Sequence, residues 1–190
     1  DIQDSLSKTN VMIQLKISES TMEVGSGTII DVDDDFYYVI TNEHVIRSMG
    51  VAISYKVITS DGIQSLFELL HHDAIKDLAI IRFPKESRSN ITPIAFSNME
   101  SEIDEFVISI GNPYGSMGAF TMGSISSYET LTILNQEAIS HTAVLARGSS
   151  GGALVNIRGQ LLGINTWGTN SVFYAIPLRV ILTFLASTTY

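Results

Sequence analysis

The sequence predicts an all-β fold of two six-stranded antiparallel β-barrels followed by a C-terminal helix. Short β-prone runs separated by turn residues recur along most of the chain, as is typical of barrels and sandwiches. Hydrophobic residues make up 45% and charged residues 16% of the 190 residues, which is a globular composition. A helical apolar pattern is clear only at the end, where Leu178, Ile181, Leu182 and Leu185 follow Pro177.

The first barrel is predicted from the β-prone runs of the N-terminal half. These runs are residues 11–17, 25–32, 36–41, 51–55, 64–70 and 78–83. Asp33 to Asp35 connect two of them as a hairpin turn, and a short helical turn is expected after Thr41. The polar stretch 85–92 is the expected linker, so we predict an N-terminal barrel within residues 1–90.

The second barrel is predicted within residues 91–190, with the terminal helix at about 177–187. Its expected strands are residues 105–110, 122–128, 130–134, 153–157, 160–166 and 172–176. Gly159 suits a left-handed position in a hairpin turn between two of them.

Charge and cysteine content exclude several classes of protein. The net charge of −9 argues against nucleic acid and anionic membranes as partners. The absence of cysteine excludes disulfides, thiolate chemistry and cysteine-bearing zinc sites. No apolar run approaches the roughly 18 residues that span a bilayer. The polar start lacks a signal-peptide pattern, so we expect a cytoplasmic chain or one whose targeting segment has been removed.

The motif that most strongly indicates a catalytic role is RGSSGGAL at residues 147–154, in which three glycines surround Ser150. Glycines let a substrate approach the backbone and let successive amides turn toward one point. We predict Ser150 as a nucleophile, with an oxyanion hole at Gly148, Ser149 and Ser150 whose donors are the amides of Gly148 and Ser150. The alternative is a glycine-rich turn with incidental serines.

The order of the remaining candidates selects the type of triad. The motif also fits the G-x-S-x-G pattern of α/β-hydrolases, but those enzymes place a histidine after the serine. All histidines here precede Ser150: His44, His71, His72 and His141. The order histidine, aspartate, serine is that of chymotrypsin-type triads.

His44 and Asp77 are the predicted partners of the nucleophile. His44 directly follows a predicted strand and can act as general base, and Asp77 precedes an apolar strand and can orient it. Asp73 is the competing carboxylate, for which a turn role is expected. His71 and His72 are adjacent and would point to opposite faces of a strand, so no metal or other cofactor is expected.

Taken together, these segments resemble the protease domain of the HtrA (DegP/DegS-like) group of trypsin-like serine proteases. The similar stretches are GSGTIID at 25–31, YYVITNEHVI at 37–46, DAIKDLAIIRF at 73–83, SIGNPYG at 109–115, RGSSGGALVN at 147–156, GQLLGINT at 159–166 and YAIP at 174–177. The resemblance implies two perpendicular barrels with the active site in the cleft between them, and it places Asp77 at the family's catalytic aspartate. Ser149 departs from the usual asparagine.

The resemblance also implies a substrate-binding site and a cellular location. Substrate-binding residues are expected at Val144, Arg147, Thr166, Trp167 and Gly168. Val144 stands where a trypsin carries the carboxylate that selects basic residues, so small or medium apolar P1 residues are expected. Polypeptide substrates and an extracytoplasmic location follow from the family. We expect this chain to lack the PDZ-dependent regulation of many relatives. The trimers of relatives use an N-terminal region without a clear counterpart here, which leaves the oligomeric state open.

The sequence therefore predicts a serine endopeptidase that works by acyl transfer. The alternative is a catalytically latent or inactive double barrel that binds peptides as a scaffold or holdase, and an esterase of the same fold is a third hypothesis. His141 is expected at the surface, with the rim of the substrate pocket as the other option.

Overall fold

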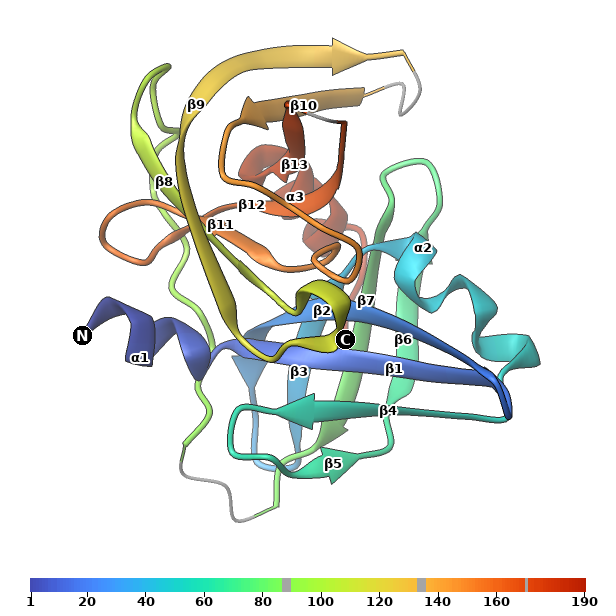
Figure 1. Ribbon diagram of the computed structural model, residues 1–190. Coiled ribbons are helices and arrows are strands. Elements are labelled where there is room, and N and C mark those ends of the chain that lie inside the picture. The colour runs from blue at the N-terminus through green and yellow to red at the C-terminus, as the bar shows by residue number, and fades with distance from the viewer. Residues whose placement is uncertain (87–89, 133–135, 170) are drawn as a thin grey trace.

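The computed structural model describes residues 1–86, 90–132, 136–169 and 171–190, and it consists of two β-units with a helix packed on them (Figure 1). The N-terminal unit is a seven-stranded sheet with strand order β5-β4-β1-β2-β3-β7-β6. Its strands are β1 (Asn10–Ser18), β2 (Thr21–Val32), β3 (Phe36–Thr41), β4 (Ser54–Thr59), β5 (Gln64–Ser65), β6 (Glu68–Asp73) and β7 (Leu78–Pro84).

The C-terminal unit is a closed antiparallel barrel with strand order β10-β13-β12-β11-β8-β9. Its strands are β8 (Phe106–Gly111), β9 (Ala119–Leu131), β10 (Gln136–His141), β11 (Ala153–Val155), β12 (Leu161–Gly168) and β13 (Phe173–Pro177). The predicted all-β fold is confirmed. The N-terminal unit differs in detail, because it is a curled seven-stranded sheet where a closed six-stranded barrel was expected.

Short helices connect and cover these strands. They are α1 (Ile2–Ser7), α2 (Glu43–Ile46), the 3-10 turns η1 (Arg47–Val51) and η2 (Pro113–Gly115), and α3 (Leu178–Ala186). The helical turn expected after Thr41 and the terminal helix are both present. Among the helices in the described ranges, none combines the length and the apolar character that a bilayer crossing requires.

One apolar core joins the two units. Ile40 and Ile80 of the N-terminal sheet, Ile110 and Ile164 of the barrel, and Phe184 of α3 belong to the same buried cluster. Each of these side chains is at most 2% exposed. The ends of β3 and β7 are therefore held against the loops that follow β8 and precede β11, which is where the candidate site lies.

Several sequence predictions on individual elements are wrong. The strand expected at 64–70 is divided into β5 and β6, and the strands expected at 122–128 and 130–134 are not separate, because β9 extends from Ala119 to Leu131. Residues 51–53 are not a strand, since η1 extends to Val51 and β4 begins at Ser54. Neither α1 nor β10 was expected, although Asp1 caps α1 by accepting a bond from the Gln3 amide at 2.9 Å.

The predicted division at residue 90 stays a prediction. Part of the linker expected at 85–92, residues 87–89, lies outside the described residues. The same is true of residues 133–134 at the end of the strand expected at 130–134.

Candidate active site

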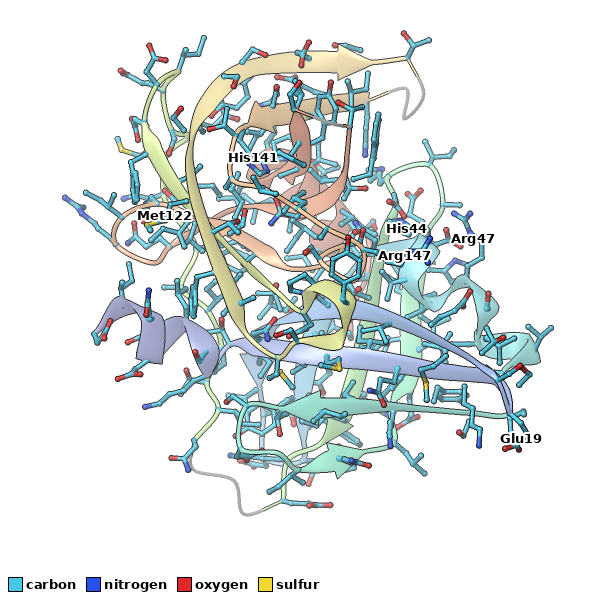
Figure 2. The ribbon with its side chains drawn as sticks, in the orientation of Figure 1. Glu19, His44, Arg47, Met122, His141 and Arg147 are labelled. Atoms are coloured by element: carbon cyan, nitrogen blue, oxygen red, sulfur yellow. The ribbon has the colours of Figure 1, made fainter. Side chains whose placement is uncertain are left out.

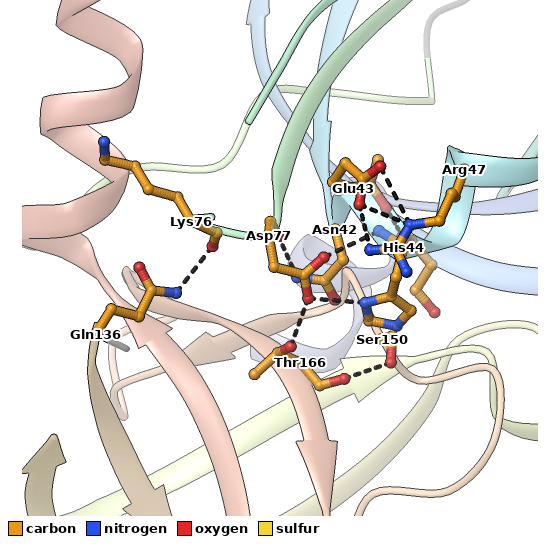
Figure 3. Close-up of polar contacts among 11 residues, drawn as sticks. Asn42, Glu43, His44, Arg47, Lys76, Asp77, Gln136, Ser150 and Thr166 are labelled. Carbon is orange, nitrogen blue, oxygen red and sulfur yellow. Dashed lines mark hydrogen bonds and ion pairs between the residues drawn. The ribbon is translucent and has the colours of Figure 1, made fainter. Parts of the chain in front are cut away.

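His44 and Asp77 come together where the N-terminal sheet faces the barrel (Figure 3). β3 ends at Thr41 and α2 begins at Glu43, which places His44 in the first turn of this short helix. Asp77 lies in the turn before β7, at a left-handed φ of 55°. Asparagine and aspartate tolerate this conformation better than most residues do. The side-chain amide of Asn42 donates to the Asp77 carbonyl at 3.0 Å and supports it.

The Asp77 carboxylate accepts hydrogen bonds from three donors. The His44 amide donates to Oδ1 at 2.9 Å, and His44 Nδ1 and Thr166 Oγ1 lie 2.7 and 2.9 Å from Oδ2. The Asp77 side chain is only 8% exposed, so these bonds lie in a low dielectric. A carboxylate only accepts, which assigns the proton to His44 Nδ1 and leaves Nε2 as an acceptor.

Ser150 lies beside the His44 ring in Figure 3, and the dashed line from its hydroxyl leads to the Thr166 carbonyl. Its Oγ donates to the Thr166 carbonyl at 2.6 Å. In the described residues the hydroxyl makes no hydrogen bond to His44 Nε2. A rotation about the Cα–Cβ bond of Ser150 is the motion that would exchange one acceptor for the other, and such bonds often tighten only in a substrate complex.

Thr166 contacts both halves of this arrangement. Its hydroxyl donates to Asp77 and its carbonyl accepts from Ser150. The sequence suggested Thr166 only as a substrate-binding residue. The contact with Asp77 was missed because the two residues are 89 positions apart and belong to different units, and no local pattern links them.

The loop that carries Ser150 is fixed through its backbone carbonyls. The carbonyls of residues 147 to 150 accept, in order, from the Tyr114 amide at 2.6 Å, Ser26 Oγ at 2.6 Å, the Gly152 amide at 3.0 Å and the Ser26 amide at 2.8 Å. In a trans peptide the N–H and the carbonyl point in opposite directions, so a bond that holds the carbonyl oxygen also sets the direction of the N–H. The donors come from both units, so the loop takes its shape at their interface.

The amides of this loop divide into engaged and available ones. The Ser149 amide donates to the Ala146 carbonyl at 2.9 Å. Within the ranges that the structure describes, the amides of Gly148 and Ser150 make no hydrogen bond. These two amides are the donors that the glycine pattern suggested, and the Ser149 hydroxyl accepts a bond from the Ala146 amide at 3.3 Å.

Glycine is required at two positions of the loop. Gly148 and Gly151 adopt φ angles of 100° and 92°. A Cβ atom at Gly151 would lie 1.9 Å from the Ser26 carbonyl oxygen, and one at Gly148 would lie 2.5 Å from the Asn112 oxygen. The conformation and the close backbone approach therefore exclude side chains at both positions.

Comparison with known proteins identifies the family of this chain. The sequence matches the family described as "Trypsin-like peptidase domain" over residues 25–164. The chain belongs to the trypsin-like peptidase family. The resemblance to the HtrA group is also confirmed by relatives named as DegP-like serine endoproteases.

Two curated relatives show how much of a longer protein the match covers. A probable periplasmic serine endoprotease, DegP-like, of Buchnera aphidicola is 37% identical over 83% of this chain and 35% of its own length. The periplasmic serine endoprotease DegP of Escherichia coli is 35% identical over 84% of this chain and 34% of its own length. The chain thus spans about a third of the length of these relatives.

Solved structures give the same fold. The serine endoprotease of Yersinia pestis superposes with a TM-score of 0.80 at 29% identity, covering 98% of this chain and 64% of that one. A protease of M. tuberculosis in its active form gives a TM-score of 0.82 at 21% identity, covering 97% and 82% of the two chains.

The substrate-binding residues expected from the family come before and after Ser150 in the sequence. The Val144 side chain is 58% exposed, and its carbonyl accepts from Thr121 Oγ1 at 2.9 Å. Arg147 is exposed, and the Trp167 ring packs on Tyr174 with centroids 4.9 Å apart. Gly168 ends β12, where a Cβ atom would lie 2.3 Å from the Phe173 ring.

His141 is buried, and the expectation of a surface position was wrong. It is 0% exposed and lies within the barrel (Figure 2). Its Nδ1 accepts from the Ala143 amide at 3.1 Å, so Nε2 carries the proton and donates to Asn165 Oδ1 at 3.0 Å. Burial lowers the pKa of His141 to about 4, although the bond to Asn165 acts in the opposite direction. The imidazole is therefore neutral and links β10 and β12.

Asp73 has the turn role that the sequence suggested. Its Oδ1 accepts from the amides of Ile75 and Lys76 at 2.9 and 3.0 Å. These bonds and the nearby Lys76 ammonium lower the pKa of Asp73, against a desolvation contribution that raises it. The carboxylate thereby caps the turn that leads to Asp77.

Proposed function

We propose that the chain is a serine endopeptidase with Ser150 as nucleophile, His44 as general base and Asp77 as the orienting carboxylate. The observation that carries this proposal is the Asp77 carboxylate with its three donors, which fixes one tautomer of His44 beside a serine on a backbone-bonded loop. Family membership supports the same assignment.

The proposed reaction begins when Ser150 Oγ leaves the Thr166 carbonyl and turns to His44 Nε2. Oγ attacks the scissile carbonyl while its proton passes to Nε2, and the resulting imidazolium is stabilised by ionised Asp77. The oxyanion is held by the amides of Gly148 and Ser150. His44 then protonates the leaving amine, which leaves the acyl-enzyme. In the second half, His44 takes a proton from a water molecule that attacks the acyl group, and returns the proton to Ser150.

The proposed substrates are extended polypeptides with a small or medium apolar P1 residue. Such a chain can pair with the backbone of Thr166 to Gly168, and the apolar Val144 offers no counter-charge to a basic side chain. Peptides that differ only in valine, lysine or aspartate at P1 test this. We expect kcat/KM to be at least about 10-fold higher for valine, and equal or higher values for lysine would refute the proposed preference.

An extracytoplasmic location is proposed from the relatives, whose names describe them as periplasmic. Fractionation of the source cells, with antibody detection, tests it. Recovery with the cytoplasmic fraction would contradict the proposal.

The decisive experiment compares the parent chain with Ser150→Ala on casein at neutral pH, together with labelling by a fluorophosphonate. We expect hydrolysis and labelling by the parent, and a loss of about 10⁶-fold in kcat in the variant. Hydrolysis by both chains would mean that Ser150 is not the nucleophile. If neither folded chain cleaves casein and the parent is not labelled, the scaffold hypothesis replaces the peptidase.

A further inference from the structure

A buried hydroxyl of the N-terminal sheet contacts the loop that carries Ser150. Ser26 lies in β2 and is 0% exposed. Its Oγ donates to the Gly148 carbonyl at 2.6 Å, although the two residues are 122 positions apart. The Asn112 amide and Asn112 Nδ2 both donate to the same Oγ, at 2.8 and 3.0 Å.

These contacts determine the direction in which the hydroxyl proton of Ser26 points. A hydroxyl has one proton and two acceptor sites. Both donors from Asn112 are N–H groups, which occupy the two acceptor sites, so the proton must point to the Gly148 oxygen. The orientation of the Ser26 hydroxyl is therefore set by its three hydrogen-bond partners.

The orientation of the Asn112 amide is equally determined. Asn112 Oδ1 accepts from the Gly118 amide at 3.0 Å and from Asn10 Nδ2 at 2.8 Å. Asn112 Nδ2 donates to the Val11 carbonyl at 2.9 Å. A flipped side chain would set oxygen against the Val11 carbonyl and nitrogen against the Gly118 amide. Asn112, which is 0% exposed, thus presents a donor to Ser26 in a fixed position.

The bond to Gly148 acts on the central peptide of the loop. The peptide between Gly148 and Ser149 separates the two peptides whose N–H groups are available to an oxyanion. Its N–H donates to the Ala146 carbonyl and its oxygen accepts from Ser26.

We infer that Ser26, oriented by Asn112, is a positioning residue for the oxyanion hole. Without its hydroxyl the Gly148 carbonyl is a buried acceptor lacking a donor, which is costly, and glycine at a φ of 100° readily admits a rotated peptide. Rotation of this peptide displaces the amides of Gly148 and Ser150 on either side of it. The inference rests on the proposed function.

The test measures hydrolysis of a chromogenic peptide amide with valine at P1, by the parent, Ser26→Ala and Thr28→Val. Thr28 is the matched control, because its buried hydroxyl also crosses from β2 to the loop, donating to the Gly151 carbonyl at 3.2 Å beyond the oxyanion peptides. We expect kcat of Ser26→Ala to fall about 10- to 100-fold with KM within about 2-fold of the parent. Thr28→Val should keep kcat within about 2-fold.

Two further readouts separate positioning from a general loss of structure. The affinity for a peptide boronic acid, whose tetrahedral adduct places an oxygen in the oxyanion hole, should fall by the same factor as kcat in Ser26→Ala. The pH profile of kcat/KM should keep the parent's midpoints, since His44 and Asp77 are untouched. Should Ser26→Ala unfold at the assay temperature, Ser26→Cys keeps the shape with a weak donor and should give a smaller loss in the same direction.

The outcomes distinguish this inference from the proposed function. An inactive parent would defeat the endopeptidase proposal itself. An active parent with an unchanged kcat in Ser26→Ala would overturn the role of Ser26 and leave the endopeptidase in place. Equal losses in Ser26→Ala and Thr28→Val would also overturn it, because they would indicate a loop that is merely loosened.

Discussion

The two halves of the candidate site are held by different kinds of contact. On one side, the side chains of His44 and Thr166 both bond directly to the Asp77 carboxylate. On the other side, the loop around Ser150 is held by its own carbonyls, which accept from Ser26, Tyr114 and Gly152. The first half therefore depends on which side chains are present, whereas the second depends on where the backbone lies.

The largest expected effect tests the side-chain half. Asp77→Asn should lower kcat by about 10⁴-fold, because the amide can present a donor to His44 and favour the wrong tautomer. Asp73→Asn is the matched control, since it changes a nearby carboxylate that bonds the Ile75 and Lys76 amides and the Lys76 ammonium. Its kcat should stay within about 2-fold of the parent. A comparable loss in both variants, measured by peptide hydrolysis, would contradict the division of roles.

The next prediction tests the backbone half through two glycines with positive φ. Gly151→Ala should lower the free energy of unfolding by more than about 3 kcal/mol, because a Cβ atom would lie 1.9 Å from the Ser26 carbonyl oxygen. Gly62→Ala, at a φ of 82° with open space around it, should cost only about 1 kcal/mol.

Urea unfolding of both glycine variants provides the measurement. If Gly151→Ala is no less stable than Gly62→Ala, then the approach of β2 to the loop is not a restraint. The contrast drawn above between the two halves would then fail.

The smallest expected effect concerns His141, which is buried in the barrel. His141 is neutral in the fold with a pKa of about 4, below the ordinary 6.5, so the unfolded chain binds its proton first as the pH falls. Its contribution to stability is complete above about pH 6.5 and declines toward pH 4, by about 3 kcal/mol in total.

His141→Gln removes this titration while keeping a polar side chain that can donate to Asn165. We expect the difference in unfolding free energy between pH 7 and pH 4 to be about 3 kcal/mol smaller in the variant than in the parent. Denaturant unfolding at both pH values measures this. An identical pH dependence in the two chains would show that His141 is protonated in the fold or exposed.

Prediction from sequence succeeded where local pattern decides structure. β3 was predicted at residues 36–41, where it lies, because a continuous apolar run follows an aspartate turn. Gly159 adopts the predicted left-handed conformation, with a φ of 76°. β10 was missed because Gln136 to His141 has little β-prone character of its own, and its pairing with β9 and β13 makes it a strand.

The sequence by itself determined most of the strands, the terminal helix and the candidates His44, Asp77 and Ser150, because each of these is encoded within a few neighbouring residues. Only the tertiary structure decided which groups hold them. The contacts of Ser26 with Gly148 and of Thr166 with Asp77 join residues 122 and 89 positions apart. His141 likewise lies inside the barrel although its neighbours in sequence are polar. Burial and long-range hydrogen bonds depend on how the strands close around one another, and no local pattern records that closure.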